Sequence, residues 1–387
     1  MIDFDFSQKC YQCGNCKDVC PNKAIEYIEN DTGDFLPYIA KEKCIDCRLC
    51  EKVCPRLNVR GTSHVFEAVS AYGTDAEPIQ KSASGGIFYS IAKRLLEDGG
   101  YVCACVLQEN MQAEHILSNS IEDLARMQGS KYIKSNTEKV LPQMENRLIA
   151  GDRILFCGTP CQIAAIENRF EKYRDQLFLI GLFCHGVPPQ KVFDVYISWL
   201  EKRYNKKVVN VNFRSKNHPT KEHEVVFDDG SKKFYYKNQA TYMCFFWGGV
   251  MLNTCFESNC QYKSNFAGDL MIGDAWGYEG SLRNIYDGRI SNVLCLTEKG
   301  TMLLDNPTII KEKTTIEHIY RFQPYLQHGF KANKNRNVIL HNLSEESWKK
   351  TIYEYKLSSR KRDVAYSIGL YPVISKLKKI IKGKQKA

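Results

Sequence analysis

The sequence has no apolar run long enough to cross a membrane. Its longest, MCFFWGGVML from Met243 to Leu252, is about half the length that a transmembrane helix requires. The chain also begins, with MIDFDFSQKC, without the basic segment and apolar stretch of a secretory signal peptide. These two absences predict a cytoplasmic protein.

Disulfide bonds are not expected in a cytoplasmic protein. The 387 residues include 17 cysteines, and in a reducing compartment so many thiols indicate metal ligands rather than a disulfide framework. Hydrophobic residues at 43% and charged residues at 25% are ordinary for a globular protein. The length allows two or three domains.

The body of the chain carries little net charge. The whole chain has +10, but residues 360–387 hold nine Lys or Arg against one acid, a net of +8 that leaves +2 for the other 359 residues. A nucleic-acid partner is therefore not expected. The last residues, SIGLYPVISKLKKIIKGKQKA, combine apolar residues at helical intervals with six lysines in the final twelve positions. They predict either peripheral contact with an anionic membrane surface or an acidic partner, or a solvated C-terminus.

Residues 1–58 contain few apolar residues for their length, so bound metal is expected to hold this segment together. Two runs of cysteines there share one spacing of two, two and three intervening residues, and each run ends in proline. The first run is Cys10, Cys13, Cys16 and Cys20 before Pro21, and the second is Cys44, Cys47, Cys50 and Cys54 before Pro55.

This spacing is the bacterial dicluster ferredoxin pattern, in which the fourth cysteine of each run binds the other cluster. It predicts two [4Fe–4S] clusters. A pair of zinc sites is the weaker alternative, because structural zinc sites use separated pairs of cysteines. Nothing in residues 1–58 offers a substrate pocket, so this segment is expected to carry single electrons for chemistry elsewhere. The predicted ligand sets are Cys10, Cys13, Cys16 and Cys54 for one cluster, and Cys44, Cys47, Cys50 and Cys20 for the other.

After residue 60 the pattern is that of an α/β (α+β) fold. Short, nearly continuous apolar runs alternate with helical stretches, which predicts strands buried on both faces. Strands are expected within 65–74, 101–107, 153–160, 177–184, 208–216 and 269–277, a hairpin within 222–237, and helices within 85–100 and 160–173. From about residue 315 the chain is expected to be helical and polar.

A loop of small residues precedes the first of these helices, with Ser82, Ser84, Gly85 and Gly86 in order. Free N–H groups at a helix N-terminus bind anions, so the loop could cradle the phosphates of a nucleotide or a flavin. Ordinary capping by serine, with glycine for close packing, explains the same residues equally well.

Five motifs follow one another in an order that resembles a known family. They are KSASGGIF, GSKYIKS, FCGTPCQIAAI, LFCHGVPP and GDLMIGDAWG. The family is that of coenzyme F420 hydrogenase/dehydrogenase beta subunits, which also includes a plant chlorophyll-cycle reductase. The resemblance extends from about residue 5 to 300, with the dicluster ferredoxin segment in front, as in many bacterial members.

The resemblance implies an FAD-containing iron–sulfur oxidoreductase with one further cluster near the flavin. It implies a ferredoxin domain at 1–60, the two parts of a mixed α/β flavin-binding domain at 65–145 and 146–312, and a helical region with the basic tail at 313–387. The Ser/Gly loop and the GSKY stretch would bind the flavin, through Ser82, Ser84, Gly85, Gly86, Ser130, Lys131 and Tyr132.

The further cluster would take its ligands from Cys161, Cys184, Cys255 and Cys260. Cys161 and Cys184 each follow an apolar strand, at the edge of an α/β sheet where ligands gather. The last pair departs from the family pattern, which has two residues between these cysteines, whereas this chain has four, with Glu257 in the expected place. Ligation by Cys255 is the preferred interpretation. The alternatives are an oxygen ligand from Glu257 and the absence of this cluster.

Other residues have simpler expected roles. Cys103, Cys105, Cys157 and Cys295 are expected to pack in the core, as free cysteine commonly does. His185 could donate a proton near the flavin or hydrogen-bond within its own loop, and no residue is assigned as catalytic.

The sequence therefore predicts a flavo-iron–sulfur oxidoreductase. A redox partner protein or a ferredoxin would exchange single electrons with the clusters. The flavin would exchange electron pairs with an organic substrate or a deazaflavin. The alternatives are a non-catalytic electron-transfer subunit of a larger complex, for instance one serving a surface-polysaccharide pathway, and a member that has lost the flavin or the third cluster.

Overall fold

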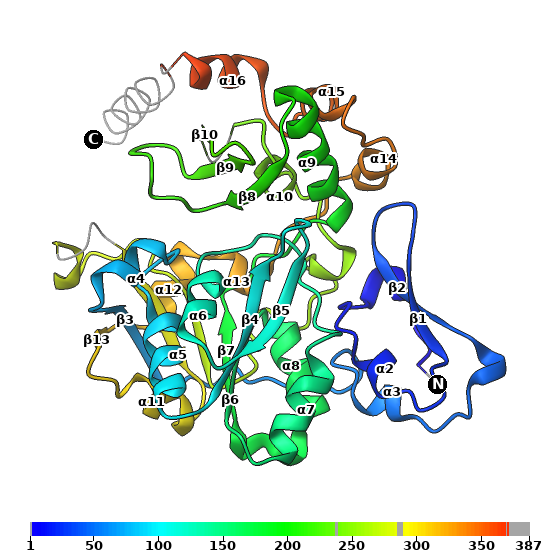
Figure 1. Ribbon diagram of the computed structural model, residues 1–387, viewed down its shortest axis with the longest axis vertical. Helices are drawn as coiled ribbons and strands as arrows, with labels where there is room; N and C mark the ends of the chain where they lie inside the picture. Colours follow the sequence, from blue (N-terminus) through cyan, green and yellow to red (C-terminus); the bar gives the residue numbers. More distant parts are fainter. Residues whose placement is uncertain (1, 237–238, 285–288, 369, 371–387) are drawn as a thin grey trace. The chain divides into compact units, whose positions relative to one another are not determined.

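The computed structural model describes residues 2–236, 239–284, 289–368 and 370, and they pack as two compact units (Figure 1). Among these described residues, those of the first unit fall within 1–30, 34–187 and 252–331, and those of the second within 31–33, 188–251 and 332–370. These units group residues by packing rather than by sequence order, and the expected domain ranges stay predictions.

The N-terminal part of the first unit is small and is built around the two cysteine runs. Cys16 lies on the short helix α2 and Cys50 on the short helix α3. Its elements are α1 (Phe6–Lys9), α2 (Asn15–Asp18), the antiparallel hairpin β1 (Ile25–Glu29) and β2 (Phe35–Ile39), the 3-10 turn η1 (Lys41–Lys43) and α3 (Leu49–Lys52).

A mixed sheet forms the centre of the first unit. Among the described residues it has eight strands, in the order β13-β3-β12-β11-β7-β6-β4-β5. Strands β3, β11, β7, β6 and β4 run in one direction, and β13, β12 and β5 run antiparallel to their neighbours. The strands are β3 (Glu67–Gly73), β4 (Tyr101–Leu107), β5 (Ala113–Ser118), β6 (Ile154–Gly158), β7 (Leu177–Leu182), β11 (Leu270–Asp274), β12 (Ser291–Cys295) and β13 (Ile309–Lys313).

Helices cover both faces of this sheet (Figure 1). On strand β6, Leu155 packs with residues of α5 and α6, whereas Phe156 packs on the opposite face with residues of α7 and α8. A strand buried on both faces has no polar side, which explains the continuous apolar runs in the sequence. The helices of this unit are α4 (Ala76–Lys81), α5 (Ile87–Glu97), α6 (Ile121–Met127), α7 (Leu141–Ile149), α8 (Pro160–Arg169), η2 (Glu171–Gln176), η3 (Asn253–Cys255), η4 (Ser281–Asn284), α11 (Glu298–Leu304), α12 (Ile316–Phe322) and α13 (Tyr325–His328).

The second unit has a three-stranded antiparallel sheet and helices around a buried aromatic core. Trp348, Tyr196 and Phe245 are fully buried there, with the Trp348 ring 5.1 Å from Tyr196 and 4.8 Å from Phe245. The elements are α9 (Gln190–Tyr204), β8 (Val208–Asn212), β9 (His223–Phe227), β10 (Lys232–Tyr235), α10 (Met243–Trp247), α14 (Arg336–His341), α15 (Trp348–Glu354) and α16 (Arg360–Ser367).

The α/β prediction is confirmed, including the helix that follows the Ser/Gly loop, the strand before it and the hairpin of β9 and β10. Strands β5, β12 and β13 were not predicted from the sequence, because their apolar runs are weaker. Strands β5 and β13 are the two outer strands of the sheet, and β12 is antiparallel to both of its neighbours. The hairpin in the N-terminal part was not predicted either.

The basic tail is only partly described. Helix α16 ends at Ser367, and the tail at residue 369 and from 371 to 387 lies outside the described residues. Among the helices that are described, none is long and apolar enough to cross a membrane.

Candidate functional site

The eight cysteines of the two N-terminal runs line two separate cavities. Each cavity takes three cysteines from one run and the fourth from the other run, which is the grouping that the ferredoxin spacing predicts. The sets are Cys10, Cys13, Cys16 and Cys54 for the first cavity, and Cys20, Cys44, Cys47 and Cys50 for the second.

The first set suits a cationic cluster core. Burial, followed by the charge of Cys16, raises the pKa of Cys10 to about 12. Burial also raises the pKa of Cys16 to about 11. Thiolates are the ligands of iron, and buried thiolates that repel one another are stabilised by the positive charge of bound iron. The donor set therefore fits a [4Fe–4S] cluster.

The second set lies nearer the solvent. Cys13 and Cys16 of the first set are buried, whereas Cys47 of the second is exposed. On either side of Cys47 the apolar side chains of Ile45 and Leu49 are 62% and 43% exposed. The second cavity is therefore the one that another molecule can approach closely.

Four cysteines from distant parts of the chain also come together. Cys161 lies in the first turn of α8, just after β6, and Cys184 follows the end of β7. Burial raises the pKa of Cys255, and the charges of Cys184, Cys260 and Cys161 raise it further. Burial raises the pKa of Cys260 to about 11, with the charge of Lys263 opposing the rise. The set fits a further cluster for the same reason as the first.

Glu257 is more exposed to solvent than these four cysteines. Glu257 is exposed, and its backbone N–H donates to Phe330 O at 3.0 Å. Within the part of the chain that the structure describes, no three His, Cys, Asp or Glu side chains lie close enough to hold a single metal ion. That finding concerns single ions, and a cubane of four irons separates its ligand sulfurs more widely.

Two tyrosines lie between the first and third cysteine sets. Tyr11 follows Cys10, and its ring lies 5.5 Å from that of Tyr262. The Tyr11 hydroxyl accepts a hydrogen bond from Gln261 N at 3.1 Å, and the Tyr262 hydroxyl donates to Pro55 O at 2.7 Å. These contacts hold the two sets in a fixed arrangement within the first unit.

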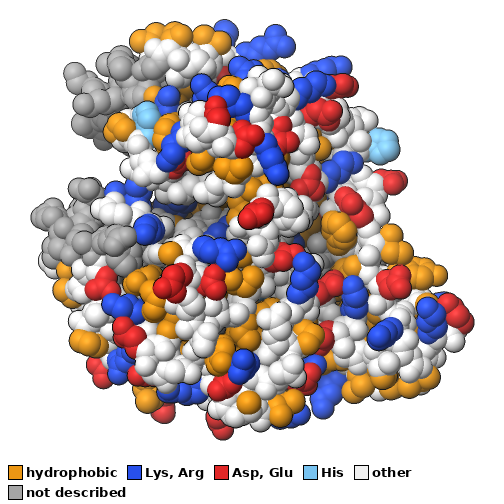
Figure 2. Space-filling view, in the orientation of Figure 1, with side chains coloured by type: hydrophobic (Ala, Val, Ile, Leu, Met, Phe, Trp, Pro, Cys, Tyr) orange, Lys and Arg blue, Asp and Glu red, His pale blue; other side chains and the backbone are white. Residues whose placement is uncertain are grey.

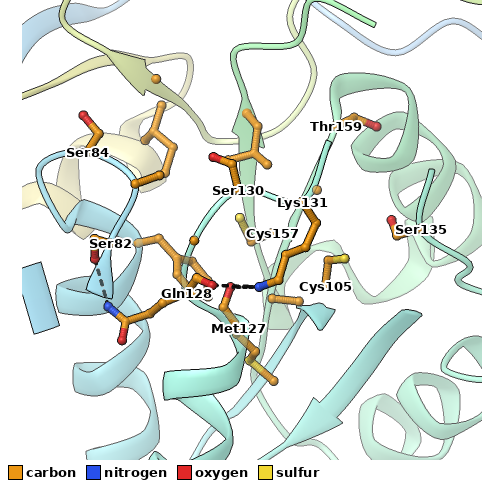
Figure 3. A pocket seen from close by; sticks show the side chains of 18 of the residues that line it. Ser82, Ser84, Cys105, Met127, Gln128, Ser130, Lys131, Ser135, Cys157 and Thr159 are labelled. Carbon is orange, nitrogen blue, oxygen red and sulfur yellow. Dashed lines mark hydrogen bonds between the residues drawn. The ribbon is translucent and has the colours of Figure 1, made fainter. Parts of the chain in front are cut away.

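A pocket opens at the carboxyl edge of the sheet, where β4, β6, β7 and β11 end. Its empty space, open mouth included, is about 990 Å³. In open α/β sheets this edge is the usual ligand site. Figure 3 shows Ser82 and Ser84 on one side and Lys131 and Thr159 on the other. Of the predicted flavin residues, Ser82, Ser84, Gly86, Ser130 and Lys131 line the pocket, whereas Gly85 and Tyr132 are not among the described residues that do.

The Ser/Gly loop serves both packing and the pocket. Ser82 accepts a hydrogen bond from Gln128 Nε2 at 2.8 Å, and Gly85 N donates to Ser291 Oγ at 3.0 Å. A Cβ atom on Gly85 would meet Ala71 O at 2.7 Å, so Gly85 is there for close packing. Gly86 begins α5 in the left-handed conformation, and no side chain caps that helix end. Its first N–H groups are therefore suited to an anion at the pocket.

Lys131 is a half-buried cation in the pocket wall. Its Nζ donates to the carbonyl oxygens of Arg126 at 2.9 Å, Met127 at 3.1 Å and Gln128 at 2.7 Å, where α6 ends. Burial lowers the pKa of Lys131 to about 8. The three carbonyls orient the ammonium, and its charge makes this wall favourable to an anionic ligand.

Three regions of the chain match models of known families. Residues 68–142 and 151–318 match the N-terminal and C-terminal parts of the coenzyme F420 hydrogenase/dehydrogenase beta subunit, and residues 9–57 match a 4Fe–4S dicluster domain. The chain belongs to the family of coenzyme F420 hydrogenase/dehydrogenase beta subunits. Its N-terminal part is an iron–sulfur domain, which makes electron transfer the general function.

Two relatives illustrate the likeness. One subunit of the F420H2 dehydrogenase of Methanosarcina mazei is 29% identical over 185 residues, which are 45% of this chain and 53% of that protein. This chain thus covers about half the length of that relative. A chain of the F420-reducing [NiFe] hydrogenase complex from Methanosarcina barkeri aligns with 18% identity over 71% of this chain and 91% of its own, with a TM-score of 0.45.

Several pocket residues in this family member were not found from the sequence. Cys105 and Cys157, expected in the core, also line the pocket, as do Gln128, Thr159 and Gln162. Thr159 and Gln162 stand on either side of Cys161 in the GTPCQ motif, so that motif was a usable signal. His185 stacks on Trp276, with ring centroids 5.7 Å apart.

His115 is a pocket residue whose ring offers a hydrogen-bond acceptor to a ligand. It is 3% exposed, and its Nε2 lies 3.1 Å from Cys157 O. A carbonyl only accepts, so Nε2 carries the proton and Nδ1 carries a lone pair. That lone pair is buried, and no described residue donates to it. Burial lowers the pKa of His115 to about 3, so the imidazole stays neutral and offers an acceptor to a ligand N–H or O–H.

Proposed function

We propose that this chain is a flavin-dependent iron–sulfur oxidoreductase. Electrons from a protein donor would enter at the exposed cysteine set, pass through the first and third sets, and reach a flavin in the pocket. The observation that carries this proposal is the position of the third cysteine set. Cys161 lies between the pocket residues Thr159 and Gln162, and Cys184 lies two residues beyond the pocket residue Leu182.

The order of the path follows from burial. The second set reaches the solvent at Cys47, whereas Cys13 and Cys16 of the first set are buried. A redox partner would dock on the surface around Ile45 and Leu49. Figure 2 shows hydrophobic side chains mixed with both signs of charge on the exterior. Complexes between electron carriers are commonly weak and bury small interfaces.

The pocket suits FAD in three respects. The uncapped N-terminus of α5 and the Lys131 ammonium favour the phosphates, and His115 Nδ1 can accept from a ring N–H or a hydroxyl. When bound, a flavin exchanges single electrons with clusters and electron pairs with an organic partner. The chain's own part is to hold these groups close together and to exclude water.

The organic partner is proposed to be a deazaflavin or another small two-electron acceptor. The Methanosarcina mazei relative is named for F420H2, which makes coenzyme F420 the first compound to assay. Reduction of F420 by the purified protein, with reduced ferredoxin as donor, would identify an enzyme rather than an electron-transfer subunit.

Anaerobic purification with iron, sulfide and flavin determination tests the proposal. Three [4Fe–4S] clusters require about twelve irons per chain, and the expected result adds one FAD. A protein with about eight irons and no flavin would be a ferredoxin-like carrier, and the enzyme proposal would be wrong.

A further inference from the structure

Residues 131–139 form one short segment that lies next to the pocket and two of the cysteine sets. Lys131 and Ser135 of this segment line the pocket. Ser135 accepts hydrogen bonds from Gln162 Nε2, at 3.0 Å on its Oγ and 3.3 Å on its carbonyl oxygen, next to Cys161. Two residues later, Thr137 Oγ1 donates to Cys13 O at 2.9 Å. Lys134 lies in the middle of this segment, so it sits where the three sites approach one another.

The Lys134 ammonium is buried, and none of the described residues forms a hydrogen bond with it. Burying an unpaired charge costs several kcal/mol. An anionic group in the loaded protein is therefore expected to compensate this one.

The charge of Lys134 acts on groups at all three sites. Burial raises the pKa of Cys10 in the first set and of Cys184 in the third, and in both cases the Lys134 charge opposes the rise. At the pocket, burial lowers the pKa of His115, and the Lys134 charge lowers it further. Lys134 is thus within electrostatic reach of both sets and of the pocket at once.

We propose that Lys134 is the shared counter-charge of the first and third clusters and raises the reduction potentials of both. This inference rests on the proposed function for the existence of the third cluster. A [4Fe–4S] core held by four thiolates is an anion, and its negative charge grows by one when it accepts an electron. A fixed cation nearby therefore stabilises the reduced form more than the oxidised form. No bond forms or breaks in this step, and the electron comes from the redox partner or, in a titration, from dithionite.

The position of Lys134 near both clusters also affects the difference between their reduction potentials. Because the same ammonium acts on both, it shifts the two potentials in the same direction and largely preserves the difference between them. Lys134 would thus make electron entry easier without creating an uphill step inside the chain. Lys134 acts on the two clusters through its charge alone and takes no part in making or breaking bonds.

Potentiometric titration of the anaerobically purified full chain, followed by electron paramagnetic resonance, tests this proposal. Lys134→Met is expected to lower the midpoint potentials of the first and third clusters. The expected size is about a tenfold change in the ratio of reduced to oxidised cluster at a given potential, which is 59 mV for one electron. The potential of the cluster held by the set with Cys47 should change much less. Lys134→Arg should keep all three potentials near those of the wild type.

Lys139→Met is the matched control, because the Lys139 side chain is 76% exposed on the same segment and pairs with Glu114. It should leave the potentials unchanged. Equal shifts at all three clusters, or none in Lys134→Met, would overturn the proposal. If Lys134→Met does not fold, Lys134→Gln provides the same comparison. If the wild type has only the two ferredoxin clusters, the proposed function fails, while the effect of Lys134 on the first cluster is still measured.

Discussion

Single side chains complete the third cysteine set. Cys255 is half-buried and lies near Cys184, Cys260 and Cys161, whereas Glu257 is exposed. We expect Cys255→Ser to lose the third cluster, about four irons per chain, because the weaker hydroxyl ligand replaces a thiolate. Glu257→Gln is the matched control and should keep its iron. The iron content of the two purified variants tests this prediction. Loss of iron in Glu257→Gln but not in Cys255→Ser would identify Glu257 as the ligand.

A second prediction at this scale concerns His115. We expect His115→Phe to weaken FAD binding about tenfold, the effect of losing one hydrogen bond of ordinary strength. Phenylalanine keeps the stacking on Phe156, whose ring lies 4.9 Å from that of His115. Titration of the flavin-free protein with FAD measures the affinity. The exposed His64 changed to Phe should bind as the wild type does, and equal affinities in all three proteins would remove His115 from the site.

At the scale of elements, the start of α5 depends on close packing of its loop. A Cβ atom on Gly85 would meet Ala71 O at 2.7 Å and Ser291 N at 2.9 Å, both of them backbone atoms. Gly85→Ala should therefore displace the loop, destabilise the fold by about 1–3 kcal/mol and lower the flavin content.

Gly99→Ala is the control for this substitution. Gly99 has a φ of +79° but no atom within 4 Å of an added Cβ, so it adds backbone strain of about 1 kcal/mol without a clash. Thermal denaturation and flavin content of the two variants separate clash from strain. A flavin content equal to the wild type in Gly85→Ala would contradict the role given to this loop.

The contact between the ferredoxin part and the sheet is a second feature at this scale. Asn15 on α2 is 1% exposed and donates to Val53 O at 3.1 Å and to Ala165 O, on α8, at 2.7 Å. Asn15→Ala leaves two buried carbonyls without these donors, and we expect a loss of about 2–3 kcal/mol. Urea denaturation followed by cluster absorbance measures it. Asn22 is exposed and donates to Lys43 O, so Asn22→Ala should change the stability by less than about 0.5 kcal/mol.

For the molecule as a whole, buried neutral histidines predict acid sensitivity. His223 in the second unit is 1% exposed, and burial lowers its pKa from 6.5 to about 3. Between these values the unfolded chain binds a proton that the folded one does not. The stabilisation is therefore complete above pH 6.5 and declines as the pH falls toward 3, by about 1.4 kcal/mol per pH unit.

Thermal denaturation at pH 7.5, 6.5 and 5.5 checks this prediction. His223→Phe should be less stable at pH 7.5, because the Tyr196 hydroxyl loses its partner at 2.9 Å. It should, however, lose less stability than the wild type between pH 6.5 and 5.5. Parallel pH profiles for the two proteins would count against a titrating His223.

The sequence by itself determined what is local. Three cysteines separated by two residues each fit one cluster, the fourth serves the other cluster, and continuous apolar runs predict a sheet that is covered on both faces. Both can therefore be read from a short window. The likeness of five ordered motifs also placed the chain in its family before any coordinates.

Only the tertiary structure decided which distant residues meet. Cys161 and Cys184 come together because β6 and β7 are adjacent parallel strands whose carboxyl ends share one edge of the sheet. His115 on β5 belongs to none of the five motifs, and the GSKYIKS motif by itself gave no role to Lys134. Both residues reach the pocket and the cysteine sets through strand order and burial. Their chemistry depends on the loss of water around an imidazole and an ammonium, and no stretch of sequence specifies how much water a folded chain will exclude.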